Sequence, residues 1–181
     1  MMVYRSKGTL ILIMAIFFTV ALIGMQASAN SDAYGARGAL SDSNLDLFEM
    51  LIYAIQDEYL AKAEYELIME KYGSIRPFIN IVTSEEQHVQ QLTRLFETYG
   101  FELPTDTARD HVVLPTDLKK AFKTGIQAEI DNIAMYAAFL GRELPADVRD
   151  VFSKLKNASE NHLRAFQNNL SRYNETEMEG K

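Results

Sequence analysis

Apolar residues recur along the chain at intervals of three and four positions, the periodicity of amphipathic helices. Four such patterns are present, over about residues 43–72, 77–100, 116–141 and 146–173. The sequence "SDSN" before the first pattern is a capping signal, and Gly73, Gly100 and Gly141 stand at helix stops. No segment alternates apolar and polar residues long enough to indicate a strand. The pattern therefore predicts an all-α fold.

The lengths of the connections predict how these helices are arranged. The first and third connections are a few residues long, so the helices that they join are antiparallel neighbours. The second connection, "FELPTDTARDHVVLP", reaches about 50 Å at roughly 3.3 Å per residue, more than the roughly 35 Å of a helix of about 23 residues. The sequence thus predicts two antiparallel hairpins joined by a long crossover loop.

An ionisable side chain interrupts the apolar stripe of every predicted helix near its middle. These residues are Glu58 on the first helix, Glu85 and His88 on the second, Glu129 on the third and His162 on the fourth. A buried carboxylate or imidazole is costly unless it is paired, hydrogen-bonded or bound to metal. Taken singly, each is more typical of a hydrogen-bonded core residue. Taken together, they indicate one shared metal site, with ligand atoms that suit iron, manganese or zinc.

Several of these segments carry a family resemblance that extends from Leu45 to Tyr173. "EYLAKAEY", "EEQH" and "AEIDNIAMY" are similar to helix motifs of rubrerythrins and other ferritin-like proteins. "EKYG", "NIVTSEEQH" and "ASENHLRAF" resemble a ferritin-like family of unknown function from archaea and bacteria, which is the closer match. The resemblance implies a ferritin-like four-helix bundle. It also implies that the five residues above hold a dimetal centre, most simply di-iron, that reacts with dioxygen or peroxide.

Ser159 is a departure from the ferritin-like pattern. Such centres usually take a Glu-x-x-His motif from two helices, but the residue three positions before His162 is Ser159. The adjacent Glu160 points about 160° away from His162 on the helical wheel and does not replace the missing carboxylate. A dinuclear and a mononuclear site both remain open, and an incomplete metal shell favours bound water or substrate.

The heights of the ligands along the first hairpin pose a difficulty. Glu58 lies about 16 residues before the turn and Glu85 about 11 after it, an offset of about 7 Å along the helices. Glu66 has the better height but lies about 80° from the direction of Glu58, so it is a reserve ligand.

Four further polar residues lie near the predicted ligands or in the crossover loop. Tyr65 and Tyr136 face inward one to two turns from the predicted ligands. They donate hydrogen bonds to ligands or act in electron transfer, or they are ordinary core residues. Asn132, one turn from Glu129, is a supporting group or a weak ligand. His111, in the crossover loop, is most simply an exposed histidine.

The N-terminal residues have the pattern of an export signal. Two positive charges precede a 17-residue apolar run, and "ASA" at residues 27–29 fits a signal-peptidase site. We expect a leader over 1–29, with a retained anchor as the alternative, and an extracytoplasmic domain in either case. The sequence predicts a flexible linker over residues 30–42, the helical domain over residues 43–173 and a flexible tail over residues 174–181.

Composition limits the functions to be considered. The chain of 181 residues has a net charge of −7, which argues against nucleic acid as a partner. It has no cysteine, so it lacks thiolate ligands and a rubredoxin-like iron site. Three functions stay open: a redox enzyme with an external electron donor or Fe(II) as substrate, a metal-sequestering protein, and a helical scaffold whose site has decayed. A homodimer is compatible with each.

Overall fold

Capping residues define where the long helices begin and end. The Asp46 side chain accepts a hydrogen bond from the Glu49 amide at 2.9 Å, and the Glu49 side chain accepts one from the Asp46 amide at 2.8 Å. This reciprocal capping box satisfies amides that the first turn leaves free. Asp117 accepts the Lys120 amide at 2.7 Å in the same way at the start of another helix. Gly100, with φ of 67°, ends a helix in the left-handed conformation that favours glycine.

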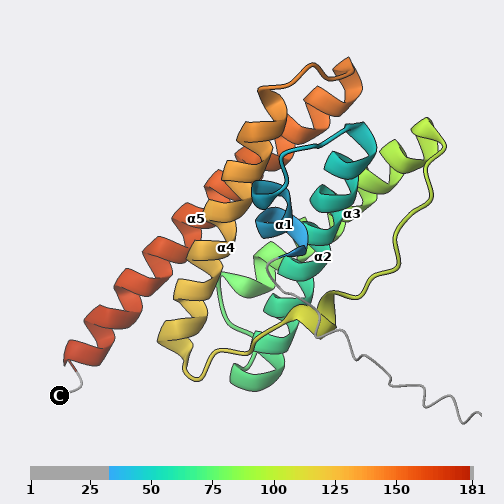
Figure 1. Ribbon diagram of the computed structural model, residues 1–181. Coiled ribbons are helices and arrows are strands. Elements are labelled where there is room, and N and C mark those ends of the chain that lie inside the picture. The colour runs from blue at the N-terminus through green and yellow to red at the C-terminus, as the bar shows by residue number, and fades with distance from the viewer. Residues whose placement is uncertain (1–32, 180–181) are drawn as a thin grey trace, which may run out of the picture.

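The computed structural model describes residues 33–179, and these contain five α-helices, a short 3₁₀-helix and no strand (Figure 1). The elements are α1 (Gly35–Ser41), α2 (Leu47–Tyr72), α3 (Phe78–Tyr99), η2 (Ala108–His111), α4 (Leu118–Leu140) and α5 (Ala146–Glu179). The predicted all-α class is confirmed. The four long helices lie within a few residues of the predicted ranges, although α5 continues through most of the segment predicted as a flexible tail.

The long helices form two pairs, α2 with α3 and α4 with α5, and each pair packs along its length. The chain between α3 and α4, hereafter the crossover segment, is residues 100–117 and carries η2. Figure 1 shows it running back along the molecule from the end of α3 to the start of α4. None of the helices among residues 33–179 is both long and apolar enough to cross a membrane. The leader predicted over residues 1–29 lies outside the described residues.

Helix α1 was not foreseen, because its sequence of small residues resembles a linker. It packs on α2 and α4 with Ala36 and Ala39 buried. Its first amides bind side chains of α2, Gly35 N donating to Gln56 Oε1 at 3.3 Å and Ala36 N to Asp57 Oδ1 at 2.8 Å. A Cβ on Gly35 would lie 2.7 Å from Asp57 Oδ1. The small residues therefore permit the close approach of two helices, which the periodicity of a seven-residue segment does not reveal.

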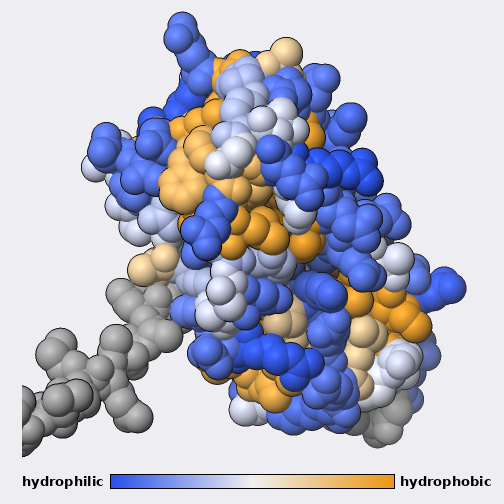
Figure 2. Space-filling model, turned by 90° about the vertical axis from the view of Figure 1, so that its right-hand side faces the viewer, coloured by the Kyte–Doolittle hydropathy of each residue, from blue (hydrophilic) through white to orange (hydrophobic). Residues whose placement is uncertain are grey.

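Two apolar clusters form the core, and a layer of buried polar side chains, hereafter the polar layer, lies between them. The first gathers residues from the beginning of α2, the end of α3, the end of α4 and the beginning of α5, including Leu51, Phe96, Phe139 and Phe152. The second gathers residues from the opposite ends of the same helices, including Ile68, Phe78, Phe122 and Phe166. Outside, the face seen in Figure 2 is mainly hydrophilic and is interrupted by apolar patches. The core thus holds the polar layer from both sides.

Replacement of Gly125 by alanine tests the packing between α4 and α5. A Cβ at this position would lie 2.6 Å from the ring of Phe166, which is fully buried. Overpacking of a core costs about 1–3 kcal/mol, more than the roughly 0.5–1 kcal/mol that alanine gains over glycine in a helix. We expect Gly125→Ala to lower the free energy of unfolding by about 1 kcal/mol in urea titrations.

Gly141→Ala is the matched control, because the nearest atom to its Cβ would be the Ala138 carbonyl oxygen at 3.4 Å and its φ is −73°. This variant should be as stable as the wild type or slightly more stable. Equal stability of the two variants would contradict the close α4–α5 contact.

Candidate metal centre

The five residues predicted as ligands come together in the polar layer between the two apolar clusters. Their side chains come from α2, α3, α4 and α5, and each residue is at least 92% buried, with relative exposures of 1% for Glu58, 2% for Glu85, 5% for His88, 3% for Glu129 and 8% for His162. The amphipathic periodicity of each helix carries its polar residue to this depth along with the apolar neighbours on the same face. Burial of so many ionisable groups requires that they satisfy one another or bind a ligand.

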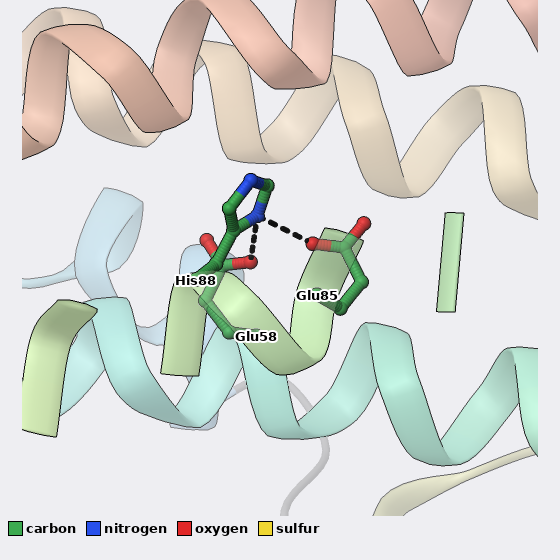
Figure 3. A group of neighbouring side chains, drawn as sticks. All are labelled: Glu58, Glu85 and His88. Atoms are coloured by element: carbon green, nitrogen blue, oxygen red, sulfur yellow. Dashed lines mark hydrogen bonds and ion pairs between the residues drawn. The ribbon is translucent and has the colours of Figure 1, made fainter. Parts of the chain in front are cut away.

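One half of the layer is built on His88 (Figure 3). Its Nδ1 lies 3.1 Å from Glu58 Oε2 and 2.7 Å from Glu85 Oε2. Its other ring nitrogen, Nε2, lies 3.2 Å from the hydroxyl of Ser84. A histidine ligand usually has such a partner on the second nitrogen, which fixes the orientation of the ring. Ser84 was not predicted, because a serine one turn before a histidine is no signal in the sequence.

The other half of the layer is built on His162. Its Nδ1 lies 3.1 Å from Glu85 Oε1 and 3.6 Å from Glu129 Oε1. The two imidazole rings, of His88 and His162, are stacked with 5.8 Å between their centroids. Glu85 therefore serves both halves, one carboxylate oxygen facing each histidine.

The two halves fit metal ions. Each offers two carboxylates and one imidazole, and one ligand atom of each residue lies within 4.8 Å of the others. Atoms bound to one zinc ion at about 2.0–2.2 Å lie up to about 4 Å apart, so small side-chain movements suffice. His162 Nδ1 is buried and has no well-aligned hydrogen-bond partner among the described residues, although carboxylate oxygens lie nearby. A buried nitrogen without an aligned hydrogen-bond partner is suited to binding a metal ion.

The predicted offset between Glu58 and Glu85 does not separate them. His88, one turn further along α3 than Glu85, lies at the height of Glu58 and contacts both carboxylates. The reserve ligand Glu66 is unnecessary, since it is half-exposed and forms ion pairs with Lys62 and Arg109 instead.

Two tyrosines hold the outer carboxylates in place. The Tyr136 hydroxyl donates to Glu58 Oε1 at 2.7 Å, and the Tyr65 hydroxyl donates to Glu129 Oε1 at 3.0 Å. Both tyrosines are fully buried. Of the two interpretations of the sequence, the geometry favours hydrogen bonding to the candidate ligands.

Ser159 faces the layer but is engaged by a neighbour. It is 3% exposed, and its hydroxyl donates to Asn132 Oδ1 at 2.7 Å. Asn132 Nδ2 in turn donates to Asp57 Oδ2 at 2.7 Å and lies 3.4 Å from Glu58 Oε1. Asp57 was missed in the sequence because it lies beside the apolar stripe of α2, towards α1. This network occupies the region from which a fourth carboxylate would reach the centre.

His111 differs from the expectation of an exposed loop histidine. It belongs to η2, is half-buried, and stacks on Tyr34 with 4.0 Å between ring centroids. It lies outside both ligand groups.

Burial and pairing shift the pKa values in the layer in different directions. Burial raises the pKa of Glu129 to about 7, and burial together with repulsion from Glu85 raises that of Glu58. Burial also opposes ionisation of Glu85, but the adjacent His162 and His88 outweigh it and lower its pKa to about 2. Burial disfavours charged imidazoles, yet the surrounding carboxylates raise the pKa of His88 to about 10 and of His162 to about 9. Without metal, the positively charged imidazolium groups of His88 and His162 thus compensate the carboxylates in place of metal ions.

The metal-free protein should lose stability as the pH rises from about 5 to about 10. The raised pKa values of His88 and His162 contribute stability that is complete below their ordinary value of 6.5 and disappears as the pH approaches 9 to 10. Glu129 adds a loss between 4.5 and about 7. Urea unfolding of chelator-treated protein at several pH values measures this slope, and stability that rises over the range would contradict the pairing. Metal should weaken the slope, because binding requires ligands without protons.

Comparison with known proteins adds relatives but no assigned activity. The family model described as "Uncharacterized protein domain (DUF2202)" matches residues 48–178. The chain is 26% identical over 142 residues to the uncharacterized protein MJ0754 of Methanocaldococcus jannaschii, covering 69% of this chain and 75% of the relative. Its fold is similar to the crystal structure of the hypothetical protein MJ0754 from Methanococcus jannaschii, with a TM-score of 0.65, 24% identity and coverage of 74% of this chain and 85% of that one. Because the family model spans most of the chain and all five residues of the polar layer, this protein belongs to the DUF2202 family.

Proposed function

We propose that this chain is a ferritin-like metalloprotein that binds two metal ions, most simply iron, in the polar layer and uses them in oxidation and reduction. The observation that carries the proposal is the position of Glu85, whose two oxygens face two separate groups of ligand atoms. A carboxylate placed in this way would hold one ion on each oxygen. The pairing of long helices around inward-facing carboxylates supports a ferritin-like arrangement.

Bound iron would supply the capacity to exchange electrons with dioxygen, with peroxide or with Fe(II) as substrate. The protein's own part is to hold the ions in a layer that lies between two apolar clusters. Tyr65 and Tyr136 would orient the carboxylates of Glu129 and Glu58 through their hydroxyl groups. Manganese and zinc suit the same donor set, and zinc would bind without redox chemistry. Because the chain contains no cysteine, electrons would come from an external donor or from the metal substrate.

Metal sequestration without turnover is the second candidate, because the three carboxylates and two imidazoles also suit zinc, which has no redox chemistry. Anaerobic loading with Fe(II) followed by exposure to air separates the candidates. An enzyme oxidises bound Fe(II) faster than buffer does and repeats the reaction when a reductant is added, whereas a sequestering protein only retains the ion.

Substitution of Glu85 tests the shared ligand. We expect wild-type protein to bind two ions per chain, Glu129→Ala to bind at most one, and Glu85→Ala to bind essentially none, because only Glu85 belongs to both groups. Elemental analysis after loading and desalting gives the stoichiometry, and circular dichroism checks the helices. Glu86→Ala is the matched control, since Glu86 is the neighbouring residue but is exposed. Two ions retained by Glu85→Ala would refute the assignment, and no uptake by the wild type would favour a scaffold with a decayed site.

Replacement of Ser159 by glutamate tests whether the centre lacks a fourth carboxylate. The new side chain would displace the hydroxyl that binds Asn132 and extend towards the ligands. We expect tighter binding of the second ion and a slower reaction with oxidants, because the open position is filled. In metal-free protein the added buried carboxylate should lower the melting temperature, since it increases repulsion. The melting temperatures of the wild type and of Ser159→Glu, each measured with and without Mn(II), test this. If Mn(II) raises both melting temperatures equally, position 159 does not reach the centre.

A further inference from the structure

A cavity of about 600 Å³ lies beside the polar layer. Residues of α1, α2, α4 and the crossover segment line it, and its inner wall includes the candidate ligands Glu58, Glu85 and Glu129. A molecule held in this cavity would therefore touch the same carboxylates that are proposed to bind metal.

The size and the lining of the cavity fit an organic molecule. Leu60 and Ala61 of α2, Ala128 of α4, and Val113 and Leu114 of the crossover segment contribute apolar walls. Sites for small organic ligands commonly enclose about 300–1,000 Å³ and are mostly apolar with a few polar groups. Dioxygen, peroxide or a hydrated ion needs much less space, since one water molecule takes about 30 Å³. The volume therefore exceeds what the passage of metal and oxidant requires.

Hydrogen bonds hold the walls of the cavity in position. The Pro115 carbonyl oxygen of the crossover segment accepts from Lys71 Nζ and from the Tyr72 hydroxyl, each at 2.7 Å. On the other side, Asp57 accepts the Ala36 amide and ties α1 to α2. A cavity with fixed walls binds a ligand without the cost of ordering loops.

One carboxylate of the cavity wall favours a cationic ligand. Six carboxylates and three basic side chains line the cavity, but Glu58, Glu85 and Glu129 face His88 and His162 and are already compensated. The basic groups Arg37, Lys120 and Lys123 are all exposed to solvent, where salt screens them. Arg37 is paired with Asp131 at 3.4 Å, and Lys120 with Asp117 at 3.5 Å. The carboxylates belong to Asp57, Glu58, Glu64, Glu85, Glu129 and Asp131.

Glu64 is the carboxylate of this wall whose role is unassigned. It lies on α2 between the apolar residue Ala61 and the buried Tyr65, is half-buried, and makes no hydrogen bond or ion pair with another residue of the described chain. Burial raises its pKa to about 7, against the opposing charge of Arg37. A cationic donor beside Glu64 would compensate its burial.

We propose that the cavity is a substrate site for an organic amine, with the ammonium group at Glu64 and the apolar body against the walls next to the metal centre. The inference rests on the proposed function for the role of the metal, but binding of the amine is measured independently of it. It assigns Glu64 as the residue that selects the amine and assigns the apolar walls as the residues that limit its size.

Three six-carbon probes test the ligand class: n-hexylamine, n-hexanol and n-hexanoate. Titration of the full-length protein, metal-free and Zn(II)-loaded, is followed by amide NMR signals of the residues that line the cavity. We expect hexylamine to bind at least about tenfold more tightly than hexanoate, because Glu64 pairs with a cation and repels an anion. Hexanoate binding as tightly as hexylamine, or no binding of hexylamine, would overturn the proposal.

Variants locate the site. Glu64→Gln should keep the fold and remove most of the preference for hexylamine, whereas Ala128→Phe should fill the cavity and abolish binding of every probe. Ala138→Phe is the matched control, because Ala138 is an exposed residue of α4 outside the cavity lining. If Ala128→Phe fails to fold, Ala61→Leu fills the same space. Unchanged binding in a folded cavity-filling variant contradicts the proposal. Binding of hexylamine by protein that takes up no metal would refute the proposed function and leave the cavity site standing.

Discussion

The burial of five ionisable side chains in one layer is the constraint on which the rest of this structure depends. Carboxylates and imidazoles without partners would oppose folding at this depth. In the metal-free chain they are compensated by one another, since His88 and His162 lie between carboxylates and carry protons at neutral pH. The apolar clusters on both sides lower the local dielectric and thereby strengthen these pairings. A pair of divalent ions would replace the same two protons.

Surrounding residues extend this compensation away from the centre. Tyr136 and Tyr65 satisfy the outer carboxylates, while Asn132 connects Ser159 to Asp57. Asp57 in turn binds the first amides of α1, so the short helix is attached to the residue next to a candidate ligand. One consequence is that the centre is asymmetric. On α5, Ser159 stands where a fourth carboxylate would lie, and it donates a hydrogen bond to Asn132 of α4. Helix α2, in contrast, contributes the adjacent acidic residues Asp57 and Glu58.

The cavity gives this asymmetry a functional interpretation. Its inner wall is formed by Glu58, Glu85 and Glu129, and its outer wall by α1 and the crossover segment. Both outer elements are fixed by hydrogen bonds, to Asp57 on one side and to Lys71 and Tyr72 on the other. With the metal of the proposed function and the amine of the further inference, metal and organic substrate would meet at the same carboxylates. A substrate of this size distinguishes the proposal from simple iron oxidation or storage, which needs only ions and oxidant.

The sequence by itself determined the helices and the identity of the candidate ligands. Amphipathic periodicity and caps depend on neighbours a few residues apart, so they are readable along the chain, and a charged residue in an apolar stripe is conspicuous there. Tertiary structure alone decided which carboxylate serves both histidines, that Ser159 binds Asn132, and that residues 35–41 form a helix on α2 and α4. It also decided the cavity and the place of Glu64 in its wall. Contacts between helices distant in sequence depend on tilt, side-chain rotamers and close approach, and these are set only when the apolar faces pack together.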